Sequence, residues 1–485
     1  MSPSPVFSDL SPAEVWQHFA TLCAIPRASK QEAALRAHLQ DWAAQAGISA
    51  EVDAAGNLIL SSPASLGCEQ VPGVILQAHL DMVCQKNSTS PHDFSRDPIQ
   101  PVLRDGWLVA DETTLGADNG IGVALILAAL SDRTLRRGPL EALLTVDEEA
   151  GMGGARGLAP GRLKGRLMLN LDTEAWGEFY LGCAGGMDVD VRRDGEPEPL
   201  PAGWTVCEIA LRGLRGGHSG VDIHEERGNA IKLMVGVLHD LAAHVPYRLV
   251  SLRGGTARNA LAREAFATLA FPEAVDLSDW LAGQQAGLRE HLRGVEAQLS
   301  LSITPASARD MLGAEEQFVW LASLHAAPHG VRRMSRQVPG VVETSNNLGM
   351  VDLQPAGGSC NFMVRSLVDR GAEALADEIV SLFALTGTVA EKSGQYPGWA
   401  PNPDSDLLKV CQAVFQREFG ADSRGQVIHA GLECGIIGAC YPGLDTVSFG
   451  PTIRGAHAPG ERVEVASVGD CWHLLRSVLS ELAQG

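Results

Sequence analysis

Four short apolar runs in the first 172 residues limit most strongly the folds that this sequence can adopt. Each run has the length and composition of a strand that is covered on both faces of a sheet. The runs are NLIL (57–60), GVILQAH (73–79), EALLTV (141–146) and RLMLNLD (166–172). Helical patterns precede or separate them, including one at 30–47 that ends in glycine and one at 120–130 with the composition of a packed helix. Strands that alternate with helices predict an α/β sandwich with a largely parallel central sheet.

The length of the chain and two polar stretches predict more than one domain. A chain of 485 residues exceeds one ordinary hydrophobic core. Stretches rich in proline and glycine lie at 192–203 and 393–406, as expected for domain junctions. We therefore predict a sheet domain built from 1–186 and 399–485, with an inserted α+β domain at 187–398.

Composition and charge exclude several classes of protein. The net charge of −20 argues against binding to nucleic acid or to an anionic membrane surface. No apolar run approaches the length of a membrane span, and the first residues lack the basic and then apolar layout of a secretion signal. None of the ten cysteines forms a CxxC pair, so we expect reduced thiols that are mostly buried. These features favour a cytoplasmic protein that binds neither nucleic acid nor membranes.

Acidic residues and histidines follow the apolar runs at the points where the strands should end. They are His79, Asp81, Asp118, Glu148, Glu149, Asp172 and His457. In open α/β sheets, the loops beyond the carboxyl ends of the strands gather at one edge and form the binding site. Glycines follow Glu149 closely, so the strand ends there and both neighbouring glutamates can point to one place.

Each of these residues has a simpler interpretation when it is taken alone. A pair of glutamates is most often an acidic surface loop, an aspartate after a strand usually caps a helix, and a histidine near glycines is usually a loop residue. Together they point to metal, because unpaired carboxylates at the ends of apolar strands are costly unless a positive charge neutralises them. No lysine or arginine lies close in sequence to Asp81, Glu148, Glu149 or Asp172. Two imidazoles and three or four carboxylates suit a pair of zinc-like ions.

Seven motifs, in order along nearly the whole chain, resemble those of one family of enzymes. They are HLDMV (79–83), LGADNGIGVA (115–124), TVDEEAGMGGA (145–155), LNLDTE (169–174), GGHSGVDIHEERGNA (216–230), HAGLECG (429–435) and SFGPTIRGAHAPGERV (448–463). They look like the motifs of the aminoacyl-histidine dipeptidases, the peptidase D or carnosinase-like branch of the di-zinc metallopeptidases. That superfamily also includes peptidases T and V and the aminoacylases.

The resemblance implies a set of metal ligands. His79 and Asp172 would hold one divalent ion, Glu149 and His457 would hold the other, and Asp118 would bridge the two. Zinc is the expected metal, with cobalt or manganese as alternatives, because carboxylate and imidazole ligands accept all three.

The resemblance also implies roles in catalysis for two further acids. Asp81 would orient the imidazole of His79 from its position two residues away. Glu148 would be the general base, which takes a proton from the attacking water and passes it to the departing amine.

Three residues of the inserted domain are candidates for binding the substrate. His218 would donate a hydrogen bond to the developing oxyanion, although a histidine that caps the following helix is an equally good interpretation. Asn259 is a second candidate donor. Arg365 would bind the C-terminal carboxylate of a dipeptide, because arginine can meet a carboxylate with two parallel hydrogen bonds. Against that role, an arginine on a strand edge is usually a solvated surface residue.

The inserted domain has the character of a lid with an internal duplication. Two β-α units of the same order and similar length occur at 204–245 and 359–387. In related enzymes a lid domain about half this size mediates dimerisation, and a histidine of that lid reaches the active site of the other subunit. We therefore predict two ferredoxin-like halves packed side by side, and the resemblance also suggests a homodimer.

Three functions are compatible with these sequence features. The first is metal-dependent hydrolysis of dipeptides, preferentially of Xaa-His dipeptides such as carnosine. The second applies the same metal chemistry to another amide, as an aminoacylase does. The third is a peptide-binding protein without catalysis, which we disfavour because Glu148 and the five implied metal ligands are all in place. Arg365 and the enlarged inserted domain favour the first.

Overall fold

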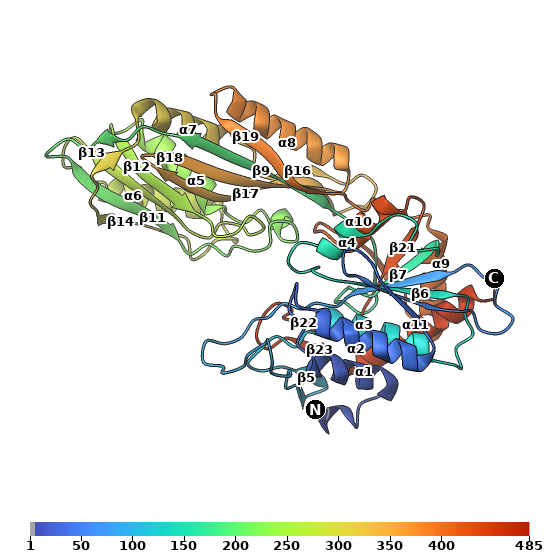
Figure 1. Cartoon of the computed structure of the whole chain (residues 1–485). Helices are drawn as coiled ribbons and strands as arrows, with labels where there is room; N and C mark the ends of the chain where they lie inside the picture. The colour runs from blue at the N-terminus through green and yellow to red at the C-terminus, as the bar shows by residue number, and fades with distance from the viewer. Residues whose placement is uncertain (1–4, 485) are drawn as a thin grey trace. The chain divides into compact units, whose positions relative to one another are not determined.

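The computed structural model describes residues 5–484, which divide into two compact units. The first unit comprises Met1–Gly182, Pro401–Val427 and Leu432–Gly485, and the second comprises Cys183–Ala400 and Ile428–Gly431. Figure 1 labels many of the helices and strands of both units. None of the helices in the described range has the length and apolar character needed to cross a bilayer.

An eight-stranded sheet with the strand order β1-β2-β6-β3-β7-β21-β8-β20 forms the centre of the first unit. The strands are β1 (Ser49–Val52), β2 (Leu58–Ser62), β3 (Val74–His79), β6 (Leu140–Thr145), β7 (Leu167–Asn170), β8 (Glu178–Cys183), β20 (Arg424–Ile428) and β21 (Asp445–Ser448). The four inner strands β6, β3, β7 and β21 run parallel, whereas β1, β2 and β8 pair in antiparallel fashion. The predicted α/β fold is confirmed, and its four inner strands are the parallel part of the sheet.

Helices cover this sheet, with α1, α2 and α3 on one side of β6 and β7 and with α4 and α10 on the other (Figure 1). The helices are α1 (Ala13–Ala24), α2 (Ala33–Ala46), α3 (Ala117–Ser131), α4 (Gly153–Gly157), α9 (Asp406–Phe419), α10 (Glu433–Cys440) and α11 (Val465–Leu482), after the short η1 (Pro5–Phe7). Nearly every residue of α3 is buried, which explains its uniformly apolar sequence. Helix α2 ends at Gly47, whose φ of 73° is the left-handed conformation that favours glycine.

A smaller sheet with the order β22-β23-β5-β4 completes the first unit. Its strands are β4 (Val102–Arg104), β5 (Trp107–Val109), β22 (Ile453–Arg454) and β23 (Arg462–Glu464). It joins the long loop before α3, which leads to Asp118, to the loop that follows β21, which carries His457.

The second unit contains an antiparallel sheet with the order β14-β11-β13-β12-β17-β18-β9-β19, and β16 pairs with β17. Its strands are β9 (Gly185–Asp194), β11 (Thr205–Arg212), β12 (Arg248–Gly254), β13 (Ala265–Phe271), β14 (Ser300–Pro305), β16 (Gly330–Met334), β17 (Val342–Gln354), β18 (Gly357–Ser366) and β19 (Val389–Tyr396). Its helices are α5 (Ala230–Leu241), α6 (Ser278–His291), α7 (Ala314–Ala326) and α8 (Asp369–Ala384), with η2 (Ile223–Glu225). A short pair, β10 (Glu198–Pro199) and β15 (Asp310–Met311), lies outside the sheet.

This sheet consists of two ferredoxin-like halves, as predicted. The first half runs β11-α5-β12-β13-α6-β14 along the chain and β14-β11-β13-β12 across the sheet. The second half runs β9-α7-β17-β18-α8-β19 along the chain and β19-β9-β18-β17 across the sheet. Both follow the βαββαβ pattern of the ferredoxin fold. The first half is inserted into the second between β9 and α7, and the pairing of β12 with β17 joins the two halves.

All four helices of the second unit contribute to one hydrophobic core, on one face of the sheet. In β9, Met187, Val189 and Val191 alternate with polar residues and join a buried cluster that includes residues of α5, α6, α7 and α8. Trp320 of α7 and Phe383 of α8 are among the largest buried side chains of this cluster.

We expect that replacing Trp320 with alanine destabilises the second unit by about 3–5 kcal/mol, because the indole is 1% exposed and its loss leaves a cavity. The measurement is the urea concentration at which β13 and β18 lose protection from hydrogen exchange. Phe318→Ala on the same helix is the matched control, because Phe318 is 72% exposed and its loss should change stability by less than about 0.5 kcal/mol. Equal effects of the two substitutions would contradict this description of the core.

Candidate metal centre

The carboxyl ends of the inner strands bring the predicted ligands together. His79 is the last residue of β3 and lies opposite Thr145, the last residue of β6. Asp172 follows β7 by two residues, and His457 lies in the loop after β21. Asp118 lies in the first turn of α3, where its backbone departs from helical geometry. Because the inner strands are parallel, their carboxyl ends share one edge of the sheet. Binding sites of open α/β sheets lie at this edge.

Two groups of side chains share the carboxylate of Asp118. His79 Nε2 lies 3.2 Å from Asp118 Oδ1 and 3.4 Å from Asp172 Oδ1. His457 Nε2 lies 3.2 Å from Asp118 Oδ2 and 3.0 Å from Glu149 Oε2. In each of these groups the possible ligand atoms lie within 4.8 Å of one another. One oxygen of Asp118 therefore faces each imidazole.

The electrostatics of these groups suit divalent cations. Burial lowers the pKa of His79, but Asp172, Asp118 and Asp81 outweigh burial and raise that pKa well above its usual value. Hydrogen bonds to Asp118 and Glu149 raise the pKa of His457 to about 11. The carboxylates thus attract positive charge strongly, and no lysine or arginine in the described part of the chain pairs with Asp118, Asp172 or Glu149. Imidazole nitrogens and carboxylate oxygens are the ligands of zinc-like ions, so the residues present fit such metals.

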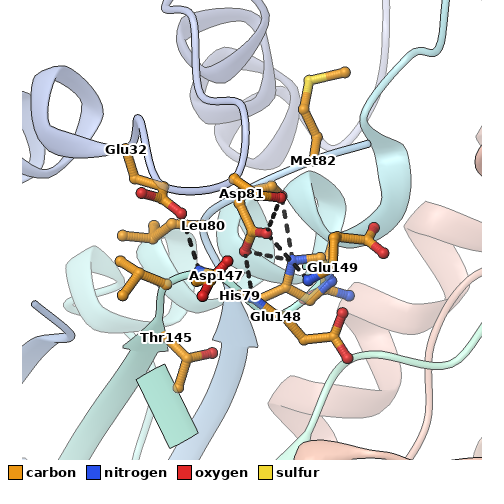
Figure 2. Close-up of polar contacts among 12 residues, drawn as sticks. Glu32, His79, Leu80, Asp81, Met82, Thr145, Asp147, Glu148 and Glu149 are labelled. Carbon is orange, nitrogen blue, oxygen red and sulfur yellow. Dashed lines mark hydrogen bonds and ion pairs between the residues drawn. The ribbon is translucent and has the colours of Figure 1, made fainter. Parts of the chain in front are cut away.

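Asp81 organises the turn that carries the two glutamates. Its buried carboxylate accepts hydrogen bonds from the backbone N–H groups of Glu148 (3.0 Å) and Glu149 (3.1 Å) and from Ser29 Oγ (2.7 Å). Asp81 Oδ1 also lies 3.4 Å from His79 Nδ1. Figure 2 shows the contacts of Asp81 with His79, Glu148 and Glu149. Burial raises the pKa of Asp81, but its hydrogen bonds outweigh burial and lower the pKa to about 2.

The pleat of β6 ends before the pair of glutamates. Asp147 has a φ of 57°, in the left-handed region, and its N–H donates to Glu32 Oε1 at 2.9 Å, as Figure 2 also shows. This turn lets the side chains of Glu148 and Glu149 leave the strict alternation of a strand. Glu148, Glu149 and His79 form a third group of possible ligand atoms within 4.8 Å.

Glu148 has the environment of a carboxylate that can accept a proton. Its carboxylate has no hydrogen-bond or ion-pair partner among the described residues. Burial raises the pKa of Glu148 well above its usual value, and Asp172, Glu149 and Glu433 raise it further against the opposing effect of His79. A carboxylate with a raised pKa, beside a group of acids that attracts metal cations, is suited to general base catalysis.

Two residues that support the metal centre were not predicted from the sequence. Glu461 accepts hydrogen bonds from the four backbone N–H groups of Leu115, Gly116, Ala117 and Asp118, at 2.7–3.2 Å. Its carboxylate thus satisfies the start of α3, where a negative charge is favourable. Glu461 belongs to the recognised motif around His457, but only the fold shows what it faces.

The second residue is Arg27, which is buried beside the same segments. Its Nη1 donates to the carbonyl groups of Leu80 and Asp81, both at 2.9 Å, and its Nη2 donates to the carbonyl of Gly116 at 2.5 Å. Arg27 therefore ties the end of β3 to the start of α3. No pattern in the sequence marks this arginine.

A chain of buried polar side chains runs beneath the centre. Glu433 Oε2 accepts hydrogen bonds from Gln77 Nε2 (2.7 Å) and Thr145 Oγ1 (2.5 Å). Gln77 Oε1 accepts a hydrogen bond from Asn170, whose side-chain oxygen accepts one from Ser448. Burial raises the pKa of Glu433 to about 7. The chain links the ends of all four parallel strands just below the ligands.

His218 lies in the second unit with one ring nitrogen engaged. Its Nδ1 accepts hydrogen bonds from the N–H groups of Gly220 (3.2 Å) and Val221 (3.0 Å), so the proton of the neutral ring is on Nε2. Burial lowers the pKa of His218 to about 4, and Arg365 adds to this effect. The ring therefore binds the turn before η2 with Nδ1 while Nε2 remains a hydrogen-bond donor.

Asn259 and Arg365 lie near His218 in the same unit. The backbone oxygen of Asn259 accepts a hydrogen bond from Ser219 N at 2.8 Å. Arg365 of β18 is buried, and its Nε and Nη1 donate to Ser219 Oγ (3.5 Å) and Tyr396 Oη (2.8 Å). Arg365 is thus not a solvated residue of a strand edge. The structure gathers the three candidate substrate ligands around one loop.

Comparisons with known proteins agree with this geometry. The sequence profile of peptidase family M20/M25/M40 matches residues 75–481. The chain is 43% identical over 478 residues to the cytosol non-specific dipeptidase of Escherichia coli (strain K12). This alignment covers 98% of this chain and 99% of that protein. The solved structure of aminoacylhistidine dipeptidase from Vibrio alginolyticus is similar with a TM-score of 0.86 and 43% identity, over 98% of this chain and 97% of that one. Aminopeptidase PepT from Bacillus cereus shares the fold, with a TM-score of 0.57 and 16% identity over 98% and 99% of the two chains.

We expect that Asp81→Asn weakens metal binding about 10–100-fold, as loss of a group that orients a ligand commonly does. Asp81 receives Glu148 N–H on one oxygen and Glu149 N–H on the other, and an asparagine has only one oxygen to offer. The measurement is metal retention against a competing chelator. Asp111→Asn, which alters an exposed carboxylate paired with Arg104 in the same unit, is the control. Equal metal affinity in Asp81→Asn and the unaltered protein would exclude the role of Asp81.

Proposed function

The chain belongs to peptidase family M20/M25/M40, and from this membership we propose that it hydrolyses the peptide bond of dipeptides, Xaa-His dipeptides preferentially. The observation that carries the proposal is the pair of ligand groups that share Asp118, with the unpartnered carboxylate of Glu148 beside them. The names of two similar proteins, a non-specific dipeptidase and an aminoacylhistidine dipeptidase, support dipeptides as the substrate class.

We propose that two divalent ions, zinc in the first place and cobalt or manganese as alternatives, are held by five residues. His79 and Asp172 would hold one ion, Glu149 and His457 would hold the other, and Asp118 would contact both. When bound, such ions lower the pKa of a water molecule and polarise the carbonyl group of the substrate. The shared carboxylate and the separate imidazoles support this division.

Glu148 and Asp81 divide the remaining work at the centre. Glu148 takes the proton of the attacking water and delivers it to the amine as the peptide bond breaks. Its raised pKa makes it a strong enough base for the first step and a good enough acid for the second. Asp81 keeps Glu148 in place through the backbone N–H of that residue and orients the ring of His79.

The second unit would supply recognition of the dipeptide. Arg365 binds the C-terminal carboxylate, because a buried guanidinium with few protein partners has donors left for a planar anion. His218 donates from Nε2 to the oxyanion that develops on the carbonyl oxygen, and Asn259 is a second donor. We also propose that the protein forms a homodimer. We propose a location in the cytoplasm as well, which the similarity to a cytosol dipeptidase supports.

We expect that the unaltered protein hydrolyses a panel of dipeptides, with Xaa-His members among the best substrates, and that Glu148→Gln lowers kcat about 10²–10⁴-fold. The variant should keep its metal, because the five proposed ligands are untouched. The measurements are dipeptide turnover and metal content on the same preparation. Substantial turnover in a metal-loaded Glu148→Gln protein would exclude Glu148 as the base, and N-acyl amino acids as the preferred substrates would indicate an aminoacylase instead.

We expect that Arg365→Met raises KM for dipeptides at least tenfold, because a charge-assisted hydrogen bond contributes about 1.5–3 kcal/mol. Discrimination against C-terminally amidated dipeptides should fall at the same time, since the group that senses the carboxylate is gone. The measurement is kcat/KM for matched acid and amide substrates. Arg253→Met, which removes an exposed arginine of the same sheet, is the control. Retained discrimination in Arg365→Met would place the carboxylate elsewhere.

A further inference from the structure

Glu174 is an acid beside the metal centre that none of the roles above employs. It lies two residues after Asp172, and its carbonyl accepts hydrogen bonds from Ile453 N (3.1 Å) and Arg454 Nη1 (3.4 Å). Strand β22, which Ile453 and Arg454 form, precedes His457 in the same loop. The backbone of Glu174 is therefore fixed between two segments that carry candidate metal ligands.

The side chain of Glu174 is in a different situation from its backbone. Its carboxylate has no hydrogen-bond or ion-pair partner among the described residues, and Arg454 donates to main-chain carbonyl groups instead. The residue is half-buried, and its backbone lies between Asp172 and the strand that precedes His457. It belongs to none of the three groups of possible metal ligands.

The other acids around the centre already have partners or tasks. Asp81 and Glu461 accept hydrogen bonds from backbone N–H groups, and Glu433 accepts two from side chains. A half-buried carboxylate among other acids is unfavourable unless a cation reaches it. The carboxylate of Glu174 could therefore bind a cationic group other than the metal ions.

The chemistry of a dipeptide supplies such a charge at the right location. The α-ammonium nitrogen of the N-terminal residue lies about 2.5 Å from the carbonyl carbon that is attacked, given standard bond lengths and angles. Any dipeptide that begins with an α-amino acid and has its scissile carbonyl at the metal centre therefore brings its ammonium group to the edge of that centre. An N-acylated amino acid brings no charge there.

We propose that the carboxylate of Glu174 binds the free α-ammonium group of the dipeptide and thereby selects dipeptides over N-acyl amino acids. This inference rests on the proposed dipeptidase function and names the residue that gives the function its requirement for an amine. Glu174 is a residue that determines specificity and takes no part in the proton transfers of Glu148.

The test compares two substrates that differ only in the amine, alanyl-histidine and propionyl-histidine. The unaltered protein should prefer alanyl-histidine at least tenfold in kcat/KM. Glu174→Gln should lower kcat/KM for alanyl-histidine about 10–100-fold, the value of one hydrogen bond between charged groups, and leave propionyl-histidine unchanged. Glu174→Asp, which retains the charge, should recover part of the preference. Metal content should stay at the level of the unaltered protein in both variants.

Glu178→Gln is the matched control, because Glu178 lies four residues further along and pairs with Arg424. It should leave the ratio of the two substrates unchanged. A preserved ratio in metal-loaded Glu174→Gln would overturn the inference, as would loss of metal from that variant, which would make Glu174 part of the metal site. Equal rates on both substrates with the unaltered protein would overturn it without any variant. No hydrolysis of any dipeptide would instead refute the proposed function itself.

Discussion

The carboxylate of Asp118, held between two imidazoles, is the interaction on which the rest of the structure depends. Its oxygens face His79 at the end of β3 and His457, which lies 339 residues after Asp118 along the chain. Such an arrangement of buried acids is stable only when positive charge lies among them, as protons or as metal ions. The parallel strands, the start of α3 and the loop after β21 must all end at one place to satisfy this condition.

The fold keeps that arrangement rigid mainly through backbone groups. Glu461 receives four N–H groups at the start of α3, Asp81 receives two in the turn after β6, and Arg27 donates to three carbonyl oxygens. Charged side chains that bind backbone groups fix where the neighbouring ligands point without occupying a ligand position. Such supports matter because a displaced ligand weakens both metal binding and catalysis.

Local patterns in the sequence predicted the sheet and the residues at its edge. The apolar runs became β2, β3, β6 and β7, and the acids and histidines that follow them meet in space. Glu461 and Arg27 were missed because their partners are backbone groups of distant segments, which no side-chain pattern marks. The roles of the ligands one by one, and the domain limits at 186 and 398, remain predictions.

The two ferredoxin-like halves show a different limit of sequence reasoning. The repeated β-α units seen in the sequence are β11-α5 and β18-α8, which are the first unit of one half and the second unit of the other. They look alike because the ferredoxin pattern itself contains two similar units. The equivalent of β11 in the second half is β9, and the entire first half separates it from α7. An interrupted repeat of this kind becomes visible only through strand pairing.

The turn after β6 explains how adjacent residues take different chemical tasks. Asp147 breaks the alternation of the strand, and Asp81 holds the N–H groups of both following residues. The carboxylate of Glu149 then lies 3.0 Å from the ring of His457, whereas that of Glu148 has no protein partner and a raised pKa. In an unbroken strand these side chains would point to opposite faces of the sheet. Anchoring and proton transfer can therefore come from neighbouring residues only because β6 ends at Thr145 and the backbone turns at Asp147, before both glutamates.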